Sequence, residues 1–203
     1  MLGGFGMQCA QSSRPASGAE HQFSHLWDMQ HHIHNGAAPS HGFKVGIASL
    51  ATTALYEVLL TRPLEELDVD RAVALWPNTS ELERRIKTTF AADDFVEKAL
   101  EETRAKYVNC ETLRAQLEVL KKLWPELRDK LRKQLIPFTK LKQMLQTVGA
   151  PVEPEQIGIS RDRLRKSFLQ AFYIRRRFTV LDVAVRAGVL DSALEEIFLT
   201  HFK

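Results

Sequence analysis

The sequence has little cysteine: its 203 residues include only Cys9 and Cys110, and these form no CxxC pair. This excludes a disulfide scaffold and predicts a reducing, cytoplasmic compartment. No uninterrupted apolar run approaches the roughly 18 residues that a membrane span requires, and no basic segment precedes the first apolar residues, as a secretory signal would need. We therefore expect neither a membrane span nor a signal peptide.

The chain also has little net charge. The chain has 28 Lys and Arg against 25 Asp and Glu, a net charge of +3, which is too small to indicate a nucleic-acid-binding protein. Residues 1–60 contain only two basic and three acidic residues, whereas residues 61–203 contain 26 basic and 22 acidic ones. The first segment is typical of a buried or site-forming region, and the second of amphipathic helices with solvated outer faces.

Strand signals are scarce, since the sequence shows no sustained period-two alternation and no Asn-Gly hairpin between apolar runs. A capping box formed by Ser17 and Glu20 predicts a helix over residues 17–34, closed by the Asn-Gly pair that follows. A second helix is expected from Ser40 to just before Arg62, where a proline follows. Its small residues allow other helices to approach it closely.

Further capping residues and prolines divide the remainder of the chain into helices. The predicted segments are Asp68 to Trp76, a helix from Ser80, Asp93 to Val108, a helix from Asn109 that Pro125 kinks or restarts, Pro137 to Val148, a helix from Ser160, and Thr179 to Gly188. The chain is therefore expected to be an all-α domain of roughly eight to ten helices of ordinary length.

Six of the seven histidines fall between residues 21 and 41. His21 and His25 are one turn apart on the same helix face, a spacing that lets two imidazoles share a metal ion. A helical hairpin can bring His41 back beside His21, and imidazole suits zinc, iron or nickel. The alternative is that these are ordinary surface or core histidines. Two or three imidazoles also leave a catalytic metal site without the carboxylate or further ligand that usually completes it.

Other polar motifs have simpler interpretations. His31, His32 and His34 lie toward the predicted helix end, where cations interact favourably with the helix dipole. Arg175-Arg176-Arg177 could contact phosphate or nucleic acid, but a solvated helix end is the preferred interpretation. Gly3-Gly4-Phe5-Gly6 lacks the third glycine and the preceding strand of a phosphate loop, which favours close helix packing. The tryptophans are expected in the core: Trp27, Trp76 and Trp124.

Three segments carry a resemblance to a known family. The stretch Ser12–His25, which reads SSRPASGAEHQFSH, resembles sn-glycerol-1-phosphate dehydrogenases. These enzymes belong to the metal-dependent superfamily of iron-containing alcohol dehydrogenases, glycerol dehydrogenase and dehydroquinate synthase. Residues 40–46, SHGFKVG, are similar to the second histidine motif of the superfamily, and residues 174–182, IRRRFTVLD, to the C-terminal signature of the subfamily.

The resemblance implies a two-domain enzyme. Its N-terminal α/β domain binds NAD or NADP, and its helical C-terminal domain carries most of the metal site. This sequence is similar to the helical domain alone, without a counterpart of the nucleotide-binding domain or of the aspartate ligand that the upstream region supplies. We therefore expect an isolated domain, a fragment or a truncated gene product, with residues 1–60 forming a metal-site helical hairpin and residues 61–203 forming peripheral helices.

The resemblance also assigns roles to three histidines. His21 and His41 match the metal ligands, with zinc as the first expectation and nickel or iron as alternatives. His25 matches a catalytic, substrate-contacting position, either as a proton relay or as a contact to the phosphate group. The implied reaction interconverts glycerol 1-phosphate and dihydroxyacetone phosphate. The alternatives are a related polyol dehydrogenase or sugar-phosphate cyclase domain and a non-catalytic helical interaction module, and a homo-oligomer is compatible with each.

Overall fold

The computed structural model describes residues 8–9, 11 and 17–203, and the all-α prediction is confirmed there. Among these residues the only β-type pairing is an isolated bridge between His34 and Ala37. The predicted packing role of the glycines between residues 3 and 6 lies outside the described part of the chain. The α-helices are α2 (Ala19–Met29), α3 (His41–Thr61), α4 (Val69–Leu75), α5 (Thr79–Thr89), α6 (Val96–Lys106), α7 (Cys110–Gln134), α8 (Phe138–Thr147), α9 (Arg161–Tyr173), α10 (Val180–Arg186) and α11 (Leu190–Thr200), and the short 3-10 helices are η2 (Leu64–Glu66) and η3 (Pro154–Ile157).

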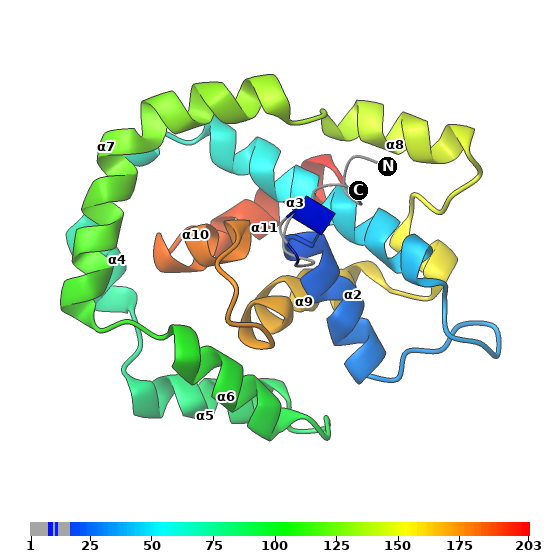
Figure 1. Ribbon diagram of the computed structural model, residues 1–203, viewed down its shortest axis with the longest axis horizontal. Helices are drawn as coiled ribbons and strands as arrows, with labels where there is room; N and C mark the ends of the chain where they lie inside the picture. The colour runs from blue at the N-terminus through cyan, green and yellow to red at the C-terminus, as the bar shows by residue number, and fades with distance from the viewer. Residues whose placement is uncertain (1–7, 10, 12–16) are drawn as a thin grey trace.

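The helix α3 crosses the middle of the molecule, with α2 on one side and α9, α10 and α11 behind it (Figure 1). Three of its small residues, Ala48, Ala51 and Ala54, are fully buried and let the neighbouring helices approach its backbone. Large side chains from α2 and α9 fill the remaining space, where Phe23 meets Phe168 edge to face at 4.9 Å between ring centroids. The helices α9 to α11, expected among the peripheral ones, therefore contribute to the core.

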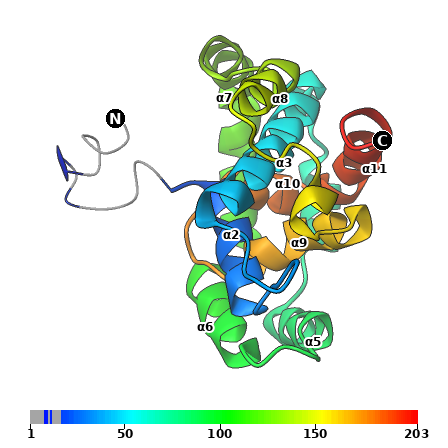
Figure 2. The same ribbon diagram turned by 90° about the vertical axis from the view of Figure 1, so that its right-hand side faces the viewer.

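The helices α4 to α8 form an arc around this centre (Figures 1 and 2). The arc has a small core of its own, made by Val69 and Ala72 of α4, Leu113 and Leu117 of α7, and Ala187. The helix α7 continues through Pro125, so the chain does not restart there, and it bends visibly in Figure 1. Trp27 and Trp124 are buried as predicted, whereas Trp76 is only half-buried and stacks on Tyr107.

The expectation of no membrane span needs one qualification. The 21-residue helix α3 is long and apolar enough, by length and composition alone, to cross a membrane. Within the fold, 67% of its most apolar stretch is buried. The central helix of a packed helical domain passes the same test.

Most predicted helix starts are confirmed by side-chain caps. The side chains of Ser40, Asp68, Asn109, Ser160 and Thr179 each accept a hydrogen bond from a backbone N–H of the first helical turn. Such a cap contributes about 1 kcal/mol to helix stability. These five predictions succeeded because donor and acceptor lie within three residues of each other.

Three predicted starts and one predicted end are wrong. The helix predicted from Asp93 begins at Val96, as α6, with Phe95 as its N-cap residue. The N-cap of α2 is Gly18 rather than Ser17, and Glu20 accepts from the Gly18 N–H at 2.8 Å, so the predicted capping box between Ser17 and Glu20 does not form. The helix α2 ends at Met29 instead of residue 34, because the backbone adopts a left-handed conformation at His31. The helix α5 is capped by Asn78, two residues before the predicted Ser80.

Candidate functional site

The hairpin of α2 and α3 brings three histidine rings together. The ring centroids of His21 and His41 are 5.3 Å apart, and those of His21 and His25 are 6.3 Å apart. The third side of the triangle, from His25 to His41, measures 6.4 Å. The one-turn spacing on α2 and the return of the chain at the start of α3 thus produce the juxtaposition that the sequence predicts, while the roles of the three residues stay predictions.

Two of the rings have their Nδ1 atoms engaged by neighbouring side chains. The Nδ1 of His21 lies 2.9 Å from a carboxylate oxygen of Glu20, and the Nδ1 of His41 lies 3.1 Å from the hydroxyl of Ser24. Ser24 is fully buried, so this second contact is held firmly by the core. Metal-binding histidines are commonly oriented in this way, by a partner on one ring nitrogen that leaves the other nitrogen for the metal.

A cavity of about 580 Å³ opens beside these rings. One side is formed by His21, Gln22 and His25 of α2, and the other by residues 175–178, which link α9 to α10, together with Glu102 of α6. The three consecutive arginines directly follow the end of α9 and line this cavity, while the Arg176 side chain stays 53% exposed. The sequence signal that could have identified them is the resemblance of residues 174–182 to a family signature.

Arg176 and Arg177 make hydrogen bonds that hold residues 175–178 in place. The Arg176 guanidinium contacts both oxygens of Glu102, and its backbone N–H donates to the same carboxylate at 2.8 Å. The Arg177 guanidinium donates to the Ser17 carbonyl, and Gln22 donates to the Arg177 carbonyl at 3.3 Å. Arg175 makes no hydrogen bond or ion pair with any described residue, so its guanidinium remains available to a ligand in the cavity.

Electrostatics in the cavity follow from this arrangement. The Arg176 side chain lowers the pKa of Glu102 to about 2, although the carboxyl is largely buried. Burial lowers the pKa of His25, and the Arg175 charge adds to this effect, while Asp28 acts in the opposite direction. The cavity therefore combines a neutral imidazole, a cationic edge and a buried anion that anchors that edge.

The other histidines between residues 21 and 41 follow the end of α2. His31 is exposed and lies 3.5 Å from Asp94. His32 is buried, and its ring contacts the Ile157 carbonyl and the Arg163 guanidinium. Burial lowers the pKa of His32, so the predicted role of a cation at the helix dipole is wrong for this residue.

The donor set is incomplete for a metal ion. Among the described residues, no group of three or more His, Cys, Asp or Glu side chains is placed to hold one. Two imidazoles with available Nε2 atoms provide half of a tetrahedral site. A further ligand would have to come from outside these residues.

The comparisons with known proteins return glycerol-1-phosphate dehydrogenases. The chain is 29% identical over 179 residues to the enzyme "Glycerol-1-phosphate dehydrogenase [NAD(P)+]" of Geobacillus stearothermophilus, which corresponds to 88% of this chain and 35% of that protein. It is 27% identical, with the same coverage, to the Geobacillus thermodenitrificans protein of the same name, and 49% identical over 53 residues to that of Haloarcula marismortui. The chain spans about 35% of the length of the first relatives it matches. No protein-family model and no solved structure matches it.

Proposed function

Because the chain belongs to the glycerol-1-phosphate dehydrogenase family, we propose that it forms the metal- and substrate-binding domain of an NAD(P)-dependent sn-glycerol-1-phosphate dehydrogenase. Such an enzyme interconverts glycerol 1-phosphate and dihydroxyacetone phosphate by hydride transfer between a carbinol carbon and nicotinamide. NAD or NADP would be bound mainly by the N-terminal domain of the family. We also propose a cytoplasmic location, which agrees with two exposed, unpaired cysteines, Cys9 and Cys110.

One observation carries the proposal: the imidazoles of His21, His25 and His41 lie within 6.4 Å of one another beside a cavity with a cationic edge. A polyol phosphate has a hydroxyl that a metal can bind and a dianionic end that a guanidinium can bind. The histidine cluster suits the first group, and Arg175 suits the second. An apolar ligand would match neither side of this cavity.

The chemistry of the donor set fits a divalent metal in part. His21 and His41 would hold zinc, or alternatively nickel or iron, through their Nε2 atoms, and the family's aspartate would supply the third ligand. A metal ion bound there would act as a Lewis acid and would lower the pKa of the substrate hydroxyl. Glu20 and Ser24 would orient the two ligand rings through their Nδ1 atoms.

The other cavity residues would bind and orient the substrate. Arg175 would hold the phosphate group, and Glu102 would keep the arginine segment in place through Arg176. His25 would either relay the hydroxyl proton toward solvent or contact the phosphate. A substrate held at both ends presents its carbinol carbon in a single orientation to the nicotinamide face.

Calorimetric zinc titration of the 203-residue chain tests the metal site. We expect weak binding at neutral pH, since two imidazoles without a carboxylate offset little of the cation's charge. His21→Ala and His41→Ala should abolish it, whereas His25→Ala should keep it. The matched control is His31→Ala, which removes an exposed histidine outside the cluster. Unchanged binding in the His21 and His41 variants would contradict the proposed ligands.

Tight stoichiometric zinc binding would contradict the proposal in a different way, because the ligand set would then be complete within this chain. A second titration separates glycerol-1-phosphate chemistry from a relative that acts on an unphosphorylated polyol. In the presence of zinc, dihydroxyacetone phosphate should bind more tightly than dihydroxyacetone, and Arg175→Gln should remove most of the difference. Equal binding of the two compounds would favour the alternative of a polyol dehydrogenase domain.

A further inference from the structure

The segment between α2 and α3, residues 30–40, connects the two histidine-bearing helices. It begins directly after Met29 and ends at the Ser40 cap of α3. His31 and Asn35 within it have φ angles of 50° and 52°, in the left-handed region that residues with side chains adopt at a cost of about 1 kcal/mol or more. Such a connection keeps one conformation only if contacts from elsewhere in the fold hold it.

His32 provides the first of these contacts. Its Nε2 lies 2.7 Å from the carbonyl of Ile157, at the end of η3, and its Nδ1 lies 2.7 Å from the Arg163 guanidinium of α9. A carbonyl can only accept and a guanidinium can only donate, so Nε2 must carry the proton and Nδ1 must accept. The neutral ring with its proton on Nε2 is the only form that makes both bonds. Burial lowers the pKa of His32 and favours this neutral form, although the Ile157 carbonyl acts in the opposite direction.

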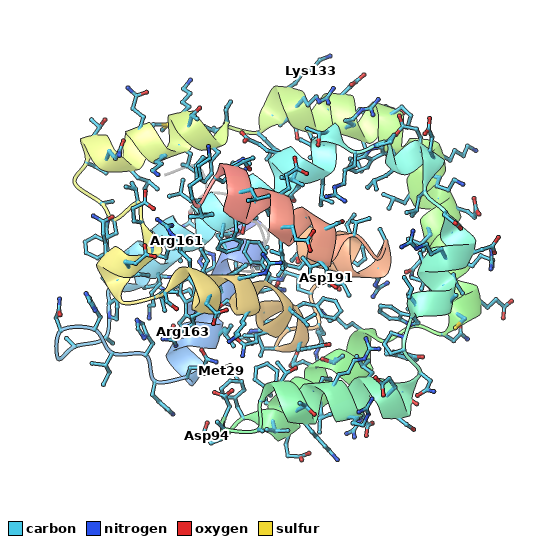
Figure 3. All side chains as sticks on the ribbon, turned by 180° about the vertical axis from the view of Figure 1, so that it is seen from behind. Met29, Asp94, Lys133, Arg161, Arg163 and Asp191 are labelled. Atoms are coloured by element: carbon cyan, nitrogen blue, oxygen red, sulfur yellow. The ribbon has the colours of Figure 1, made fainter. Side chains whose placement is uncertain are left out.

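Arg163 connects the same segment to the end of α2. Its second terminal nitrogen donates to the Gln30 side chain at 3.1 Å, and the carboxyl of Asp93 interacts with both Gln30 and Arg163. Figure 3 shows Arg163 on α9 close to Met29, the last residue of α2. One guanidinium thus binds residues on both sides of the left-handed turn at His31.

A second contact, between His34 and Gly158, also holds the connecting segment in place. The His34 ring lies so close to Gly158 that a Cβ atom there would come within 2.6 Å of His34 Nδ1. Gly158 also has a left-handed φ of 75°, so a residue with a side chain would be disfavoured there for two reasons. The connecting segment therefore contacts η3 and α9 at two successive points.

We infer that His32 and Arg163 are positioning residues, which fix the imidazole of His41 relative to that of His21 by holding the connection between their helices. Neither residue lines the histidine cavity, so they act through the backbone of residues 30–40. The structure also offers a competing explanation, since the Ser24–His41 hydrogen bond and the Lys44–Asp28 ion pair join α2 to α3 directly. The inference requires that these direct contacts are not sufficient.

The first experiment uses no metal. In the 203-residue chain, NMR of the labelled imidazoles would record ring-to-ring cross-relaxation between His21 and His41. His32→Leu removes both hydrogen bonds at nearly constant volume and should abolish this signal. His32→Gln, whose amide can donate to the carbonyl and accept from the guanidinium, should restore it. His31→Asn, at the exposed neighbouring position, is the matched control and should leave the signal unchanged, because asparagine also tolerates the left-handed φ of 50°.

If His32→Leu fails to fold, Arg163→Met replaces it, because it removes the guanidinium and leaves the bond between His32 and Ile157 in place. A folded His32→Leu or Arg163→Met variant with an unchanged ring-to-ring signal would overturn the inference. Loss of the ring-to-ring signal in both His32→Gln and His32→Leu would also overturn the inference. The signal would then not depend on the two hydrogen bonds that the glutamine side chain can replace.

The second experiment rests on the proposed function and measures zinc affinity. Residues that orient metal ligands typically change affinity by about 10- to 100-fold when they are replaced. We expect a loss of that size for His32→Leu and Arg163→Met, and recovery to near wild-type affinity for His32→Gln. If the wild-type chain binds no zinc, the proposed metal site fails, and the metal-free signal between His21 and His41 still decides the positioning role. If zinc binds with equal affinity to every folded variant, the positioning role is contradicted.

Discussion

The buried carboxylate of Glu102 should stabilise the fold in a pH-dependent way. Its side chain is only 7% exposed and is held by the backbone and guanidinium of Arg176 and by Lys98. These contacts lower its pKa from 4.5 to about 2. One pKa unit corresponds to about 1.4 kcal/mol, so this difference sets an upper value of about 3 kcal/mol. Because the Arg176 side chain is 53% exposed, water screens part of the interaction, and we expect about 2 kcal/mol.

The direction of this pH dependence follows from the lowered pKa of Glu102. Above pH 4.5 the carboxylate is charged in both the folded and the unfolded chain, and the full stabilisation is present. As the pH falls from 4.5 toward 2, the unfolded chain binds the proton first, and the stabilisation is lost progressively. Glu102→Gln, which keeps the shape but not the charge, should therefore lower the free energy of unfolding by about 2 kcal/mol at pH 7 and by progressively less as the pH approaches 2.

Urea unfolding of both proteins at pH 7, 5, 4 and 3 measures this difference. The matched control is Glu101→Gln, because Glu101 also contacts Arg176 at 2.9 Å but its side chain is 59% exposed. An exposed pair of this kind contributes little to stability, because water screens it. The reasoning is refuted if the Glu102→Gln difference is constant between pH 7 and pH 3, or if it is no larger than that of the control.

Three further predictions concern other positions in the fold. Ser167→Ala should lower the free energy of unfolding by about 1–3 kcal/mol in urea, because it leaves the buried indole N–H of Trp27 without its 2.9 Å acceptor. Burial lowers the pKa of Lys106 to about 8, so the unfolded chain binds more protons between pH 8 and 10.5. Its contribution to stability should rise with pH in that window, and Lys106→Met should remove this rise from the unfolding curves. Gly158→Ala should lower the melting temperature by several degrees, because its φ is 75° and the His34 ring occupies the Cβ position.

The parts of the fold that the sequence predicts are those set by contacts within one turn. Ser40 accepts from the N–H of Phe43, and Thr179 and Asp182 form a reciprocal capping box, so each start is encoded in four consecutive residues. The failure at Ser17 has the same local origin. The next residue, Gly18, takes the N-cap position, and its N–H is satisfied by Glu20, so two starts one residue apart compete with nearly equal local signals.

The parts that the sequence does not predict depend on partners far away along the chain. Arg176 is bound by a carboxylate 74 residues away, and Arg177 by a carbonyl 160 residues away. His32 meets the Ile157 carbonyl across 125 residues. A run of three arginines or a cluster of histidines gives no local sign of such partners, so an exposed helix end and a helix-dipole role were the natural expectations. Only the folded arrangement of α2, α6, η3 and α9 distinguishes them.

The anchoring of the arginine segment also links the cavity to an element beyond the hairpin of α2 and α3. Glu102 belongs to α6, in the outer arc, yet its carboxylate holds the segment that places Arg175 opposite His25. Burying a carboxylate is costly unless it is paired and hydrogen-bonded, and Arg176 and Lys98 give Glu102 both kinds of contact. The arc of α4 to α8 therefore does more than cover the core. Through α6 it fixes the cationic edge of the cavity, and substitutions at Glu102 should weaken binding of a phosphorylated ligand although the residue is two contacts away from Arg175.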